Sequence, residues 1–439
     1  MNGEFGMKLG RRDFISCAAV MSIPSLCFSA ERPRLRVGLL SDTHVNPDPA
    51  SCERTRMAFE TFKREKVDAI AHLGDLSNYH QIEAYRNYRN TMDTVFPDPS
   101  SAPEFLYAWG NHDSIDYERR ANPKDRQIDR HKAFAVMKDI LGIRHGLDFE
   151  MELGGYSFLG FPERITDSCS LAEFERRIAA ACARDPGKPV FLLHHPPPYG
   201  TCDNSEKGCA HSTVRILERY PQVLSINGHK HTSVMNERSI WQGKFTVVQT
   251  SCLYNWIANW ESAAKGARAQ IRSGYGAMGM DVYDGRLEFR RFDVRYPDEM
   301  HAGKRWVVPV PFMAGQAPYA LERRKATEKE GIFPAVACIS VKPDSNFNWL
   351  TVNVTPVVNR EDVRLYKIEV CRNVAEGWER IAGDDLIGDF DDPPAMRKNV
   401  LSLRMGTAGL VRGETYRFTA VPEGFFGKQG KTISCEWKA

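Results

Sequence analysis

The chain has 439 residues, of which 42% are hydrophobic and 26% are charged, and its formal net charge at pH 7 is +3. These values are ordinary for a soluble globular protein with a large core and two or three domains. The charge is too close to balance to indicate a nucleic-acid or membrane partner. No internal apolar run approaches the roughly 20 residues that a membrane span needs.

The first 30 residues predict an export signal. The stretch "MKLGRRDFISCAAVMSIPSLCFSA" runs from basic through apolar to small residues, which is the layout of a secretory signal peptide. "RRDFI", from Arg11 to Ile15, resembles the twin-arginine signal of bacteria. A general secretory signal that happens to hold two arginines is the alternative. We therefore expect a bacterial protein exported to the periplasm or beyond, with residues 1–30 outside the fold.

The cysteines give a weaker indication. Eleven are present, and Cys17 and Cys27 fall in the predicted signal, so the mature chain has an odd number. Cys202 and Cys209 enclose a polar loop and form the expected disulfide pair, because an exported protein can be oxidised. No pair has CxxC spacing, which argues against a thiolate zinc site.

Residues 34–298 alternate between apolar runs and amphipathic helical stretches. Short continuous apolar runs of this kind predict buried strands; they are "LRVGLL", "VDAIAHL", "EFLYAW", "YSFLGF", "PVFLLHH", "VLSINGH" and "FTVVQTS". "CERTRMAFETFKREK", "SLAEFERRIAAACAR" and "STVRILERY" have apolar residues at helical spacing. "GAMGMDVYDGRLEFRRFDV" predicts a hairpin that turns at Asp284-Gly285. The alternation predicts an α/β layered domain.

The sequence pattern changes after this domain. Residues 299–330 contain proline, glycine and the charge run "ERRKATEKE", which indicates a linker with one short helix. Residues 331–439 read as short alternating strands without helices between them, which is typical of a small all-β, immunoglobulin-like sandwich. "GLVRGETYRFTAV" resembles the corner of fibronectin type III domains, with Tyr416 in the tyrosine-corner position.

Polar side chains that can bind metal follow five of the predicted strands. In chain order they are Asp42 and His44, Asp75, Asn111 with His112 and Asp113, His194 with His195, and His229 with His231. In open α/β sheets the binding crevice lies outside the carboxyl ends of the strands, so these groups should converge. Carboxylate, imidazole and amide oxygen suit two divalent ions such as Zn, Mn or Fe. Gly74, Gly110 and Gly228 would let the backbone turn sharply and approach the site closely.

The order D-x-H, G-D, G-N-H-D, H-H-P and G-H-x-H resembles the calcineurin-like metallophosphoesterases over residues 34–298. The resemblance implies a four-layer α-β-β-α sandwich with a dinuclear metal centre at the strand ends. It implies one metal held by Asp42, His44, Asp75 and His231, and a second held by Asp75 as a bridge with Asn111, His194 and His229. His194 is preferred to His195 because the ligand of the family precedes the proline by two positions.

The resemblance also implies roles for the remaining residues of "GNHD". His112 would be catalytic, assisting the leaving group beside the metals, and Asp113 would orient the His112 imidazole. The expected activity is hydrolysis of a phosphoric monoester or diester by metal-activated hydroxide. Purple acid phosphatases are a more distant match, because Asn78 stands where they carry a tyrosine ligand and His44 where they carry glycine.

A rival interpretation is an exported binding or scaffold protein with an inactive metallophosphoesterase fold. The complete ligand set argues against it. The sandwich at 331–439 could contact another protein, a glycan or the catalytic domain. "SCLYNW", with Tyr254, Asn255 and Trp256, could line the pocket wall or belong to the core, and His211 could touch substrate. His72, His131, His145 and His301 match no motif and are expected to be structural or surface residues.

Overall fold

The computed structural model describes residues 31–122, 127–162, 168–206, 211–258, 270–301, 304–312 and 317–439. The predicted export signal lies outside these residues, as does Cys209, so the signal and the Cys202–Cys209 disulfide both stay predictions. None of the helices in the described ranges is long and apolar enough to cross a membrane.

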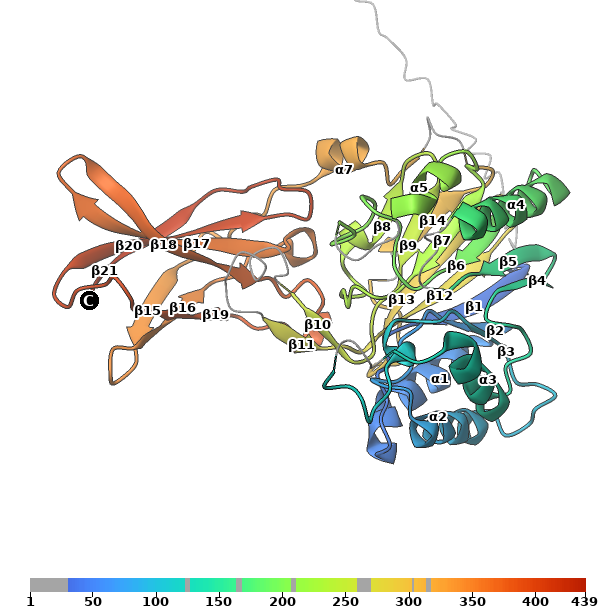
Figure 1. The fold of residues 1–439 in the computed structure, drawn as a ribbon. Coiled ribbons are helices and arrows are strands. Elements are labelled where there is room, and N and C mark those ends of the chain that lie inside the picture. Colours follow the sequence, from blue (N-terminus) through green and yellow to red (C-terminus); the bar gives the residue numbers. More distant parts are fainter. Residues whose placement is uncertain are drawn as a thin grey trace, which may run out of the picture. The chain divides into compact units, whose positions relative to one another are not determined.

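The first sheet has six strands in the order β14-β13-β12-β1-β2-β3 (Figure 1). Their bounds are β1 Leu35–Leu40, β2 Ala69–His72, β3 Glu104–Tyr107, β12 Gly276–Val282, β13 Arg286–Asp293 and β14 Trp306–Pro309. β1, β2 and β3 are parallel neighbours, whereas β12 joins β1 antiparallel. The carboxyl ends of β1, β2 and β3 therefore meet at one edge of the sheet.

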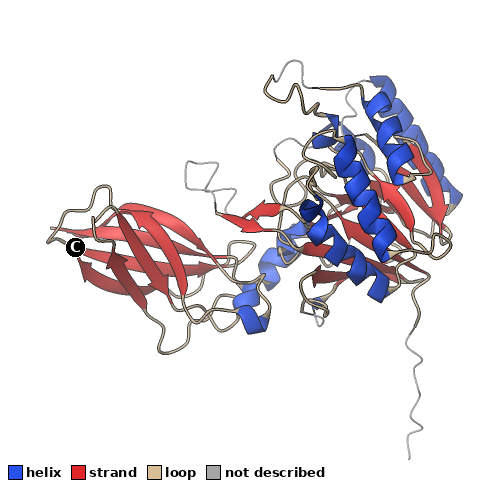
Figure 2. Cartoon of the chain, turned by 90° about the horizontal axis from the view of Figure 1, so that it is seen from below, coloured by secondary structure: helices blue, strands red, loops and turns tan. Residues whose placement is uncertain are grey.

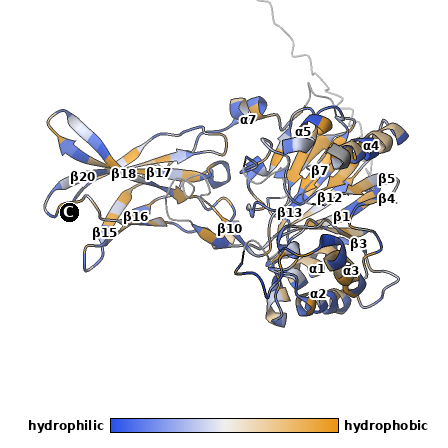
Figure 3. Ribbon diagram, viewed as in Figure 1, coloured by the Kyte–Doolittle hydropathy of each residue, from blue (hydrophilic) through white to orange (hydrophobic). Residues whose placement is uncertain are grey.

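The second sheet also has six strands, in the order β4-β5-β6-β7-β9-β8. Their bounds are β4 Phe149–Leu153, β5 Tyr156–Gly160, β6 Val190–Leu193, β7 Val223–Asn227, β8 Ile240–Gln242 and β9 Thr246–Gln249. β5, β6, β7 and β9 are parallel, and Figure 3 shows hydrophobic residues gathered along this part of the molecule. These strands are buried over most of their length, which explains their continuous apolar sequences.

Three groups of buried residues hold this part together. One contains strand residues of both six-stranded sheets, such as Val37 of β1 and Phe191 of β6. A second joins the first sheet to α1 (Glu53–Glu65), α2 (Ile82–Val95) and α3 (Arg130–Leu141). A third joins the second sheet to α4 (Ser168–Arg184) and α5 (His211–Leu217). The predicted α/β fold is confirmed, with mixed sheets.

The predicted linker contributes a strand to the first sheet. Trp306–Pro309 form β14, which pairs with β13, so the first sheet continues past residue 298. The same segment contains the expected short helix, α7 (Leu321–Thr327). The domain boundaries at 298 and 330 stay predictions.

The C-terminal region is built from two small sheets (Figure 2). The first has the order β15-β16-β19 and the second the order β18-β17-β20-β21. Their bounds are β15 Ile339–Pro343, β16 Trp349–Val354, β17 Leu365–Val374, β18 Gly377–Ile387, β19 Leu401–Gly406, β20 Thr415–Glu423 and β21 Ile433–Lys438. One buried cluster contains residues of both sheets, including the fully buried Tyr416. β18 is the strand that the sequence patterns missed, because its burial does not alternate cleanly.

Candidate metal centre

Five loops that follow parallel strands bring the predicted polar side chains together. Ser41–His44 follow β1, Leu73–Asp75 follow β2, and Ala108–His112 follow β3. The other two loops follow β6 and β7, which are strands of the second sheet. The backbone N–H of His229 donates to Asp42 Oδ2 over 2.9 Å, so a loop of the second sheet is bonded directly to a loop of the first.

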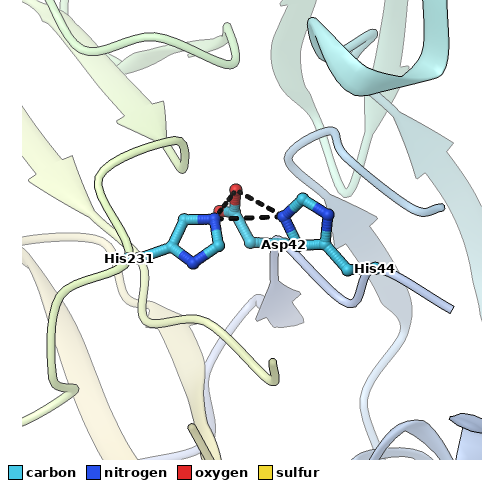
Figure 4. A group of neighbouring side chains, drawn as sticks. All are labelled: Asp42, His44 and His231. Carbon is cyan, nitrogen blue, oxygen red and sulfur yellow. Dashed lines mark hydrogen bonds and ion pairs between the residues drawn. The ribbon is translucent and has the colours of Figure 1, made fainter. Parts of the chain in front are cut away.

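The first group of possible ligands is Asp42, His44 and His231 (Figure 4). The Nε2 atoms of His44 and His231 are 3.0 Å apart, and His231 Nε2 is 3.2 Å from Asp42 Oδ1. Ligand atoms bound at about 2.0–2.2 Å to one ion lie roughly this far from one another. The three side chains could therefore hold a cation between them.

The second group is Asp75, His195 and His229. His195 Nε2 lies 3.1 Å from Asp75 Oδ2, and both side chains are buried. Asn111 stands beside this group, since its neighbour His112 donates its backbone N–H to Asp75 Oδ1 over 2.8 Å. The Asn111 Oδ1 atom is buried and has no hydrogen-bond partner within the described part of the chain, so it is available as a neutral ligand.

Hydrogen bonds fix which nitrogen of two imidazoles carries the proton. His231 Nδ1 lies 2.7 Å from the Asn255 carbonyl oxygen, and His195 Nδ1 lies 2.5 Å from the Leu73 carbonyl oxygen. A carbonyl only accepts, so each Nδ1 donates, and in the neutral imidazole the lone pair is on Nε2, where a cation can take the place of the second proton. That lone pair faces a carboxylate oxygen in both cases, which is the tautomer needed to bind a cation.

The structure places His195, and not the predicted His194, in the second group. His194 belongs to neither group, because its Nδ1 lies 2.9 Å from the Pro196 carbonyl oxygen and its Nε2 lies 3.2 Å from that of Pro162. Both ring nitrogens therefore face carbonyl oxygens and not the pocket. The next residue points the other way at the end of the strand, and His195 takes the place predicted for His194.

Asp113 also differs from its predicted role. Its carboxylate accepts backbone N–H groups of Asp75 at 3.1 Å, Leu76 at 3.1 Å and Gly110 at 2.9 Å, and the Tyr107 hydroxyl. It therefore joins the loops after β2 and β3 and does not orient His112. The His112 Nδ1 atom donates instead to the Asn78 carbonyl oxygen over 3.1 Å.

The backbone at the ligand positions is strained. Across the described ranges, nine residues other than glycine have positive φ, and five of these belong to the two groups. They are Asp42 at 52°, His44 at 44°, Asp75 at 54°, His229 at 73° and His231 at 47°. Such a conformation costs about 1–2 kcal/mol for each L-residue, and strain of this kind clusters at functional sites.

The three predicted glycines leave room for this arrangement. A Cβ on Gly74 would lie 2.5 Å from His195 Nδ1, and one on Gly110 would lie 2.2 Å from Asp75 Oδ1. A Cβ on Gly228 would lie 1.8 Å from Ser41 Oγ, the atom that donates to Asp42 Oδ2 over 2.6 Å. The predicted close approach of the backbone is confirmed.

The carboxylates of Asp42 and Asp75 favour positive charge at the two groups. Burial alone would lower the pKa of His195, but the Asp75 carboxylate outweighs it and raises that pKa to about 10. Burial likewise opposes protonation of His231, and Asp42 raises its pKa to about 12. Together with carboxylate, imidazole and amide donors whose atoms converge, this field fits a pair of divalent ions.

His72 supports two of the loops although it matches no motif, and Tyr254 of "SCLYNW" lies beside the first group. His72 is fully buried; its Nδ1 accepts the Gly74 N–H over 3.2 Å, so its Nε2 donates to Thr43 Oγ1 over 3.1 Å. The exposed Tyr254 ring lies 5.1 Å from the His44 ring, measured between centroids, at the rim of the first group. Tyr254 and Asn255 thus contact residues of the first group, whereas Trp256 is buried in the core.

Four other histidines belong to neither group. His145 is buried and accepts the Tyr107 N–H, His301 faces Glu361 at 3.4 Å, and His131 is exposed. His211 is stacked on the exposed ring of Tyr199, with ring centroids 3.6 Å apart. Contact of His211 with substrate stays a prediction.

Residues 35–233 match the sequence model of the calcineurin-like phosphoesterase family. No curated protein matches the chain. A dimetal phosphatase from Danio rerio is similar in structure, with 13% identity and a TM-score of 0.41 over 63% of this chain and 99% of that chain. A purple acid phosphatase from yellow lupin (Lupinus luteus) seeds has 11% identity and a TM-score of 0.42 over 63% of this chain and 53% of that chain. The family match confirms the predicted resemblance for residues 35–233.

Proposed function

We propose that the protein is a dinuclear metal-dependent hydrolase of phosphoric esters. The observation that carries the proposal is the pair of Asp/His groups, whose donor atoms converge and whose backbone is left-handed at five positions. Both groups lie in a region that matches the calcineurin-like phosphoesterase family. Strain of this extent is hard to explain in a scaffold protein that binds no ion.

Asp42, His44 and His231 would hold one ion, and Asp75, His195, His229 and Asn111 would hold the other. Asp75 would bridge the two ions; its Oδ2 faces His195, and its Oδ1 accepts the His112 N–H. When bound, two divalent ions of Zn, Mn or Fe would activate a water molecule and neutralise the oxygens of a phosphoryl group. The carboxylates of Asp42 and Asp75 keep the pocket attractive to cations.

His112 would act on the leaving group. Its ring lies 4.8 Å from the His44 ring, measured between centroids, and is half-buried beside the first group. Because Nδ1 donates to the Asn78 carbonyl oxygen, the ring is held in one orientation and Nε2 is left to hold or give a proton. An alkoxide that departs from a phosphoryl group needs such a proton or a positive neighbour.

The test is hydrolysis of a nitrophenyl phosphate monoester and a bis-nitrophenyl phosphate diester by protein loaded with Zn, Mn or Fe. The metal content of the same samples is measured by elemental analysis. We expect two ions per chain and turnover of at least one ester that is lost on chelation. A chain that binds two ions and hydrolyses neither ester would support the rival function as a binding protein.

The finer architecture is part of the proposal. The buried groups of the N-terminal part support a four-layer α-β-β-α sandwich. The two C-terminal sheets, and the Tyr416 hydroxyl that accepts the Val411 N–H over 2.8 Å, support a fibronectin type III-like domain at 331–439. Export through a twin-arginine signal remains part of the proposal because residues 1–30 predict it.

A further inference from the structure

A short two-stranded arm begins at the metal centre. It consists of β10 (Asn255–Ile257) and β11 (Ile271–Ser273), which pair antiparallel. The Asn255 carbonyl oxygen accepts from His231 Nδ1 over 2.7 Å, and the neighbouring Tyr254 ring lies against His44. The base of the arm therefore touches two of the three residues of the first group, and it sets the tautomer of one of them.

The arm is anchored at its base by Arg54 of α1. The Arg54 guanidinium donates to the carbonyl oxygens of Leu253 over 3.0 Å and of Gly274 over 3.2 Å, one on each side of the arm. These bonds fix where the arm starts and ends. They do not touch Trp256 or Arg272, which face each other across the arm.

The arm is also held by the end of β18 and by the loop that follows β18. Arg272 Nη1 lies 2.8 Å from Asp391 Oδ1, and the Asp391 side chain is only 14% exposed. The Trp256 ring lies 6.2 Å from the Phe390 ring, measured between centroids, and both residues belong to one buried cluster. Gln270, the residue before β11, donates through Nε2 to the carbonyl oxygen of Asp385 in β18 over 2.5 Å. Three contacts of different kinds thus join the arm to residues 385–391.

We propose that residues 385–391, in the C-terminal region, are a positioning element for the metal centre. A two-stranded ribbon with three pairs is not stable by itself in water, so its packing against other elements decides its order. The position of the Asn255 carbonyl oxygen therefore depends on how firmly the arm is held. Asp391 and Phe390 hold that arm, and through it they hold the His231 ring that faces Asp42. The inference rests on the proposed function, since it concerns the ion of the first group.

The experiment is a calorimetric titration of Zn²⁺ into the metal-free, full-length chain and its variants. Asp391→Ala removes the partner of Arg272, and we expect one of the two binding steps to weaken by about tenfold, the lower end of the range for residues that orient ligands. The other step, which belongs to Asp75, His195 and His229, should stay within about twofold of the unsubstituted chain. Asp391→Glu keeps the charge and should restore most of the affinity. Arg272→Gln should match Asp391→Ala, and the double variant should be no worse than either, because all three remove the same ion pair.

Asp362→Asn is the matched control. It weakens the Lys304–Asp362 contact of 3.3 Å, which also joins the C-terminal region to the segment before β14 but does not reach the arm. We expect both binding steps to be unchanged in this variant.

Three results would overturn the inference. Asp391→Ala could leave both steps unchanged, or it could weaken both steps equally, which would indicate general loosening of the fold. Asp362→Asn could weaken the same single step as Asp391→Ala, which would assign the effect to the contact between the regions and not to the arm. If the unsubstituted chain binds no Zn²⁺ and hydrolyses no ester, the proposed function fails and this inference fails with it.

Discussion

Left-handed backbone is used differently in the N-terminal α/β region and in the C-terminal sheets. In residues 331–439, Phe347 is the one residue other than glycine with positive φ. Five such residues lie in the loops that carry the two Asp/His groups, here called the metal loops. The C-terminal glycines with positive φ are Gly377, Gly409, Gly413 and Gly427, and a Cβ on any of them would meet nothing within 4 Å. Gly74, by contrast, leaves no room for a Cβ beside the His195 ring.

The difference separates turns that serve the fold from loops that serve a site. A C-terminal turn takes glycine because the conformation is cheap for it, and its surroundings are open. The metal loops use aspartate and histidine in the same conformation, which costs free energy of folding at each position. Their glycines stand where the backbone of one loop touches a side chain of the next. The following substitutions test whether this strain belongs to metal binding.

The largest effect is expected for Asp75→Asn. Asp75 is the group proposed to touch both ions, and its carboxylate faces His195 at 3.1 Å. We expect turnover to fall by at least about 10³-fold, since losing one stabilising donor alone costs about 10²–10³-fold. Metal content, measured by elemental analysis, should fall together with activity.

Asp344→Asn is the control in the C-terminal region. Asp344 Oδ1 accepts the N–H groups of Asn348 and Trp349 in a turn, and an asparagine retains that acceptor. Metal content and turnover should be unchanged. Two ions fully retained in Asp75→Asn would remove the dinuclear assignment.

The second prediction compares two neighbouring histidines. His195→Ala should lower metal occupancy and slow every ester by about 10²–10³-fold, because it removes a ligand and the charge stabilisation that depends on it. His194→Ala should keep both ions, since each of its ring nitrogens faces a carbonyl oxygen of the chain. The reverse pattern, with metal lost only in His194→Ala, would restore the assignment made from the motif.

The strand ends were predictable, but the direction of individual side chains was not. Apolar runs bounded by polar residues located the strands that carry the site, and parallel order placed their carboxyl ends together. "HHPPP" offers two imidazoles in sequence, and only the backbone conformation at the end of β6 decides which one joins the second group. The family resemblance implies that Asp113 orients His112, yet its carboxylate accepts three backbone N–H groups of the loops after β2 and β3.

Contacts between distant segments could not be predicted from the sequence. Nothing in "SCLYNW" shows that the Asn255 carbonyl oxygen meets His231, because a backbone group leaves no mark on residue type. The same holds for the Leu73 carbonyl oxygen on His195. The apolar patterns also missed β18, since a strand that is only partly buried along most of its length carries no clean alternation.

The third prediction concerns His112 and the leaving group. General acid help is typically worth about 10²–10⁴-fold, and we expect His112→Ala to slow an alkyl phosphate ester by roughly 10²-fold. A nitrophenolate leaves without help, so the nitrophenyl ester should slow much less, and metal content should not change. Steady-state rates on the two esters measure the difference. Equal slowing of both, or loss of metal, would make His112 a ligand or a positioning residue.

The smallest effects are expected for three glycine-to-alanine substitutions, which separate steric crowding from backbone strain. Gly228 does not have positive φ, but a Cβ there would lie 1.8 Å from Ser41 Oγ. Gly228→Ala should therefore displace Ser41 from Asp42 and lower the free energy of unfolding by about 1–3 kcal/mol, as overpacking does. It should also weaken metal binding, because Asp42 belongs to the first group.

The other two members lie in the C-terminal region. Gly409 has a φ of 86° in open space, so Gly409→Ala carries backbone strain without crowding and should cost about 1–2 kcal/mol while metal affinity stays constant. Gly406 has neither positive φ nor a neighbour within 4 Å, and Gly406→Ala should change stability by less than about 0.5 kcal/mol. Denaturant unfolding and metal titration of the three variants give both quantities. If Gly228→Ala loses stability but keeps its metal affinity, the close approach of the loops serves the fold alone, and the contrast between the two regions no longer marks a site.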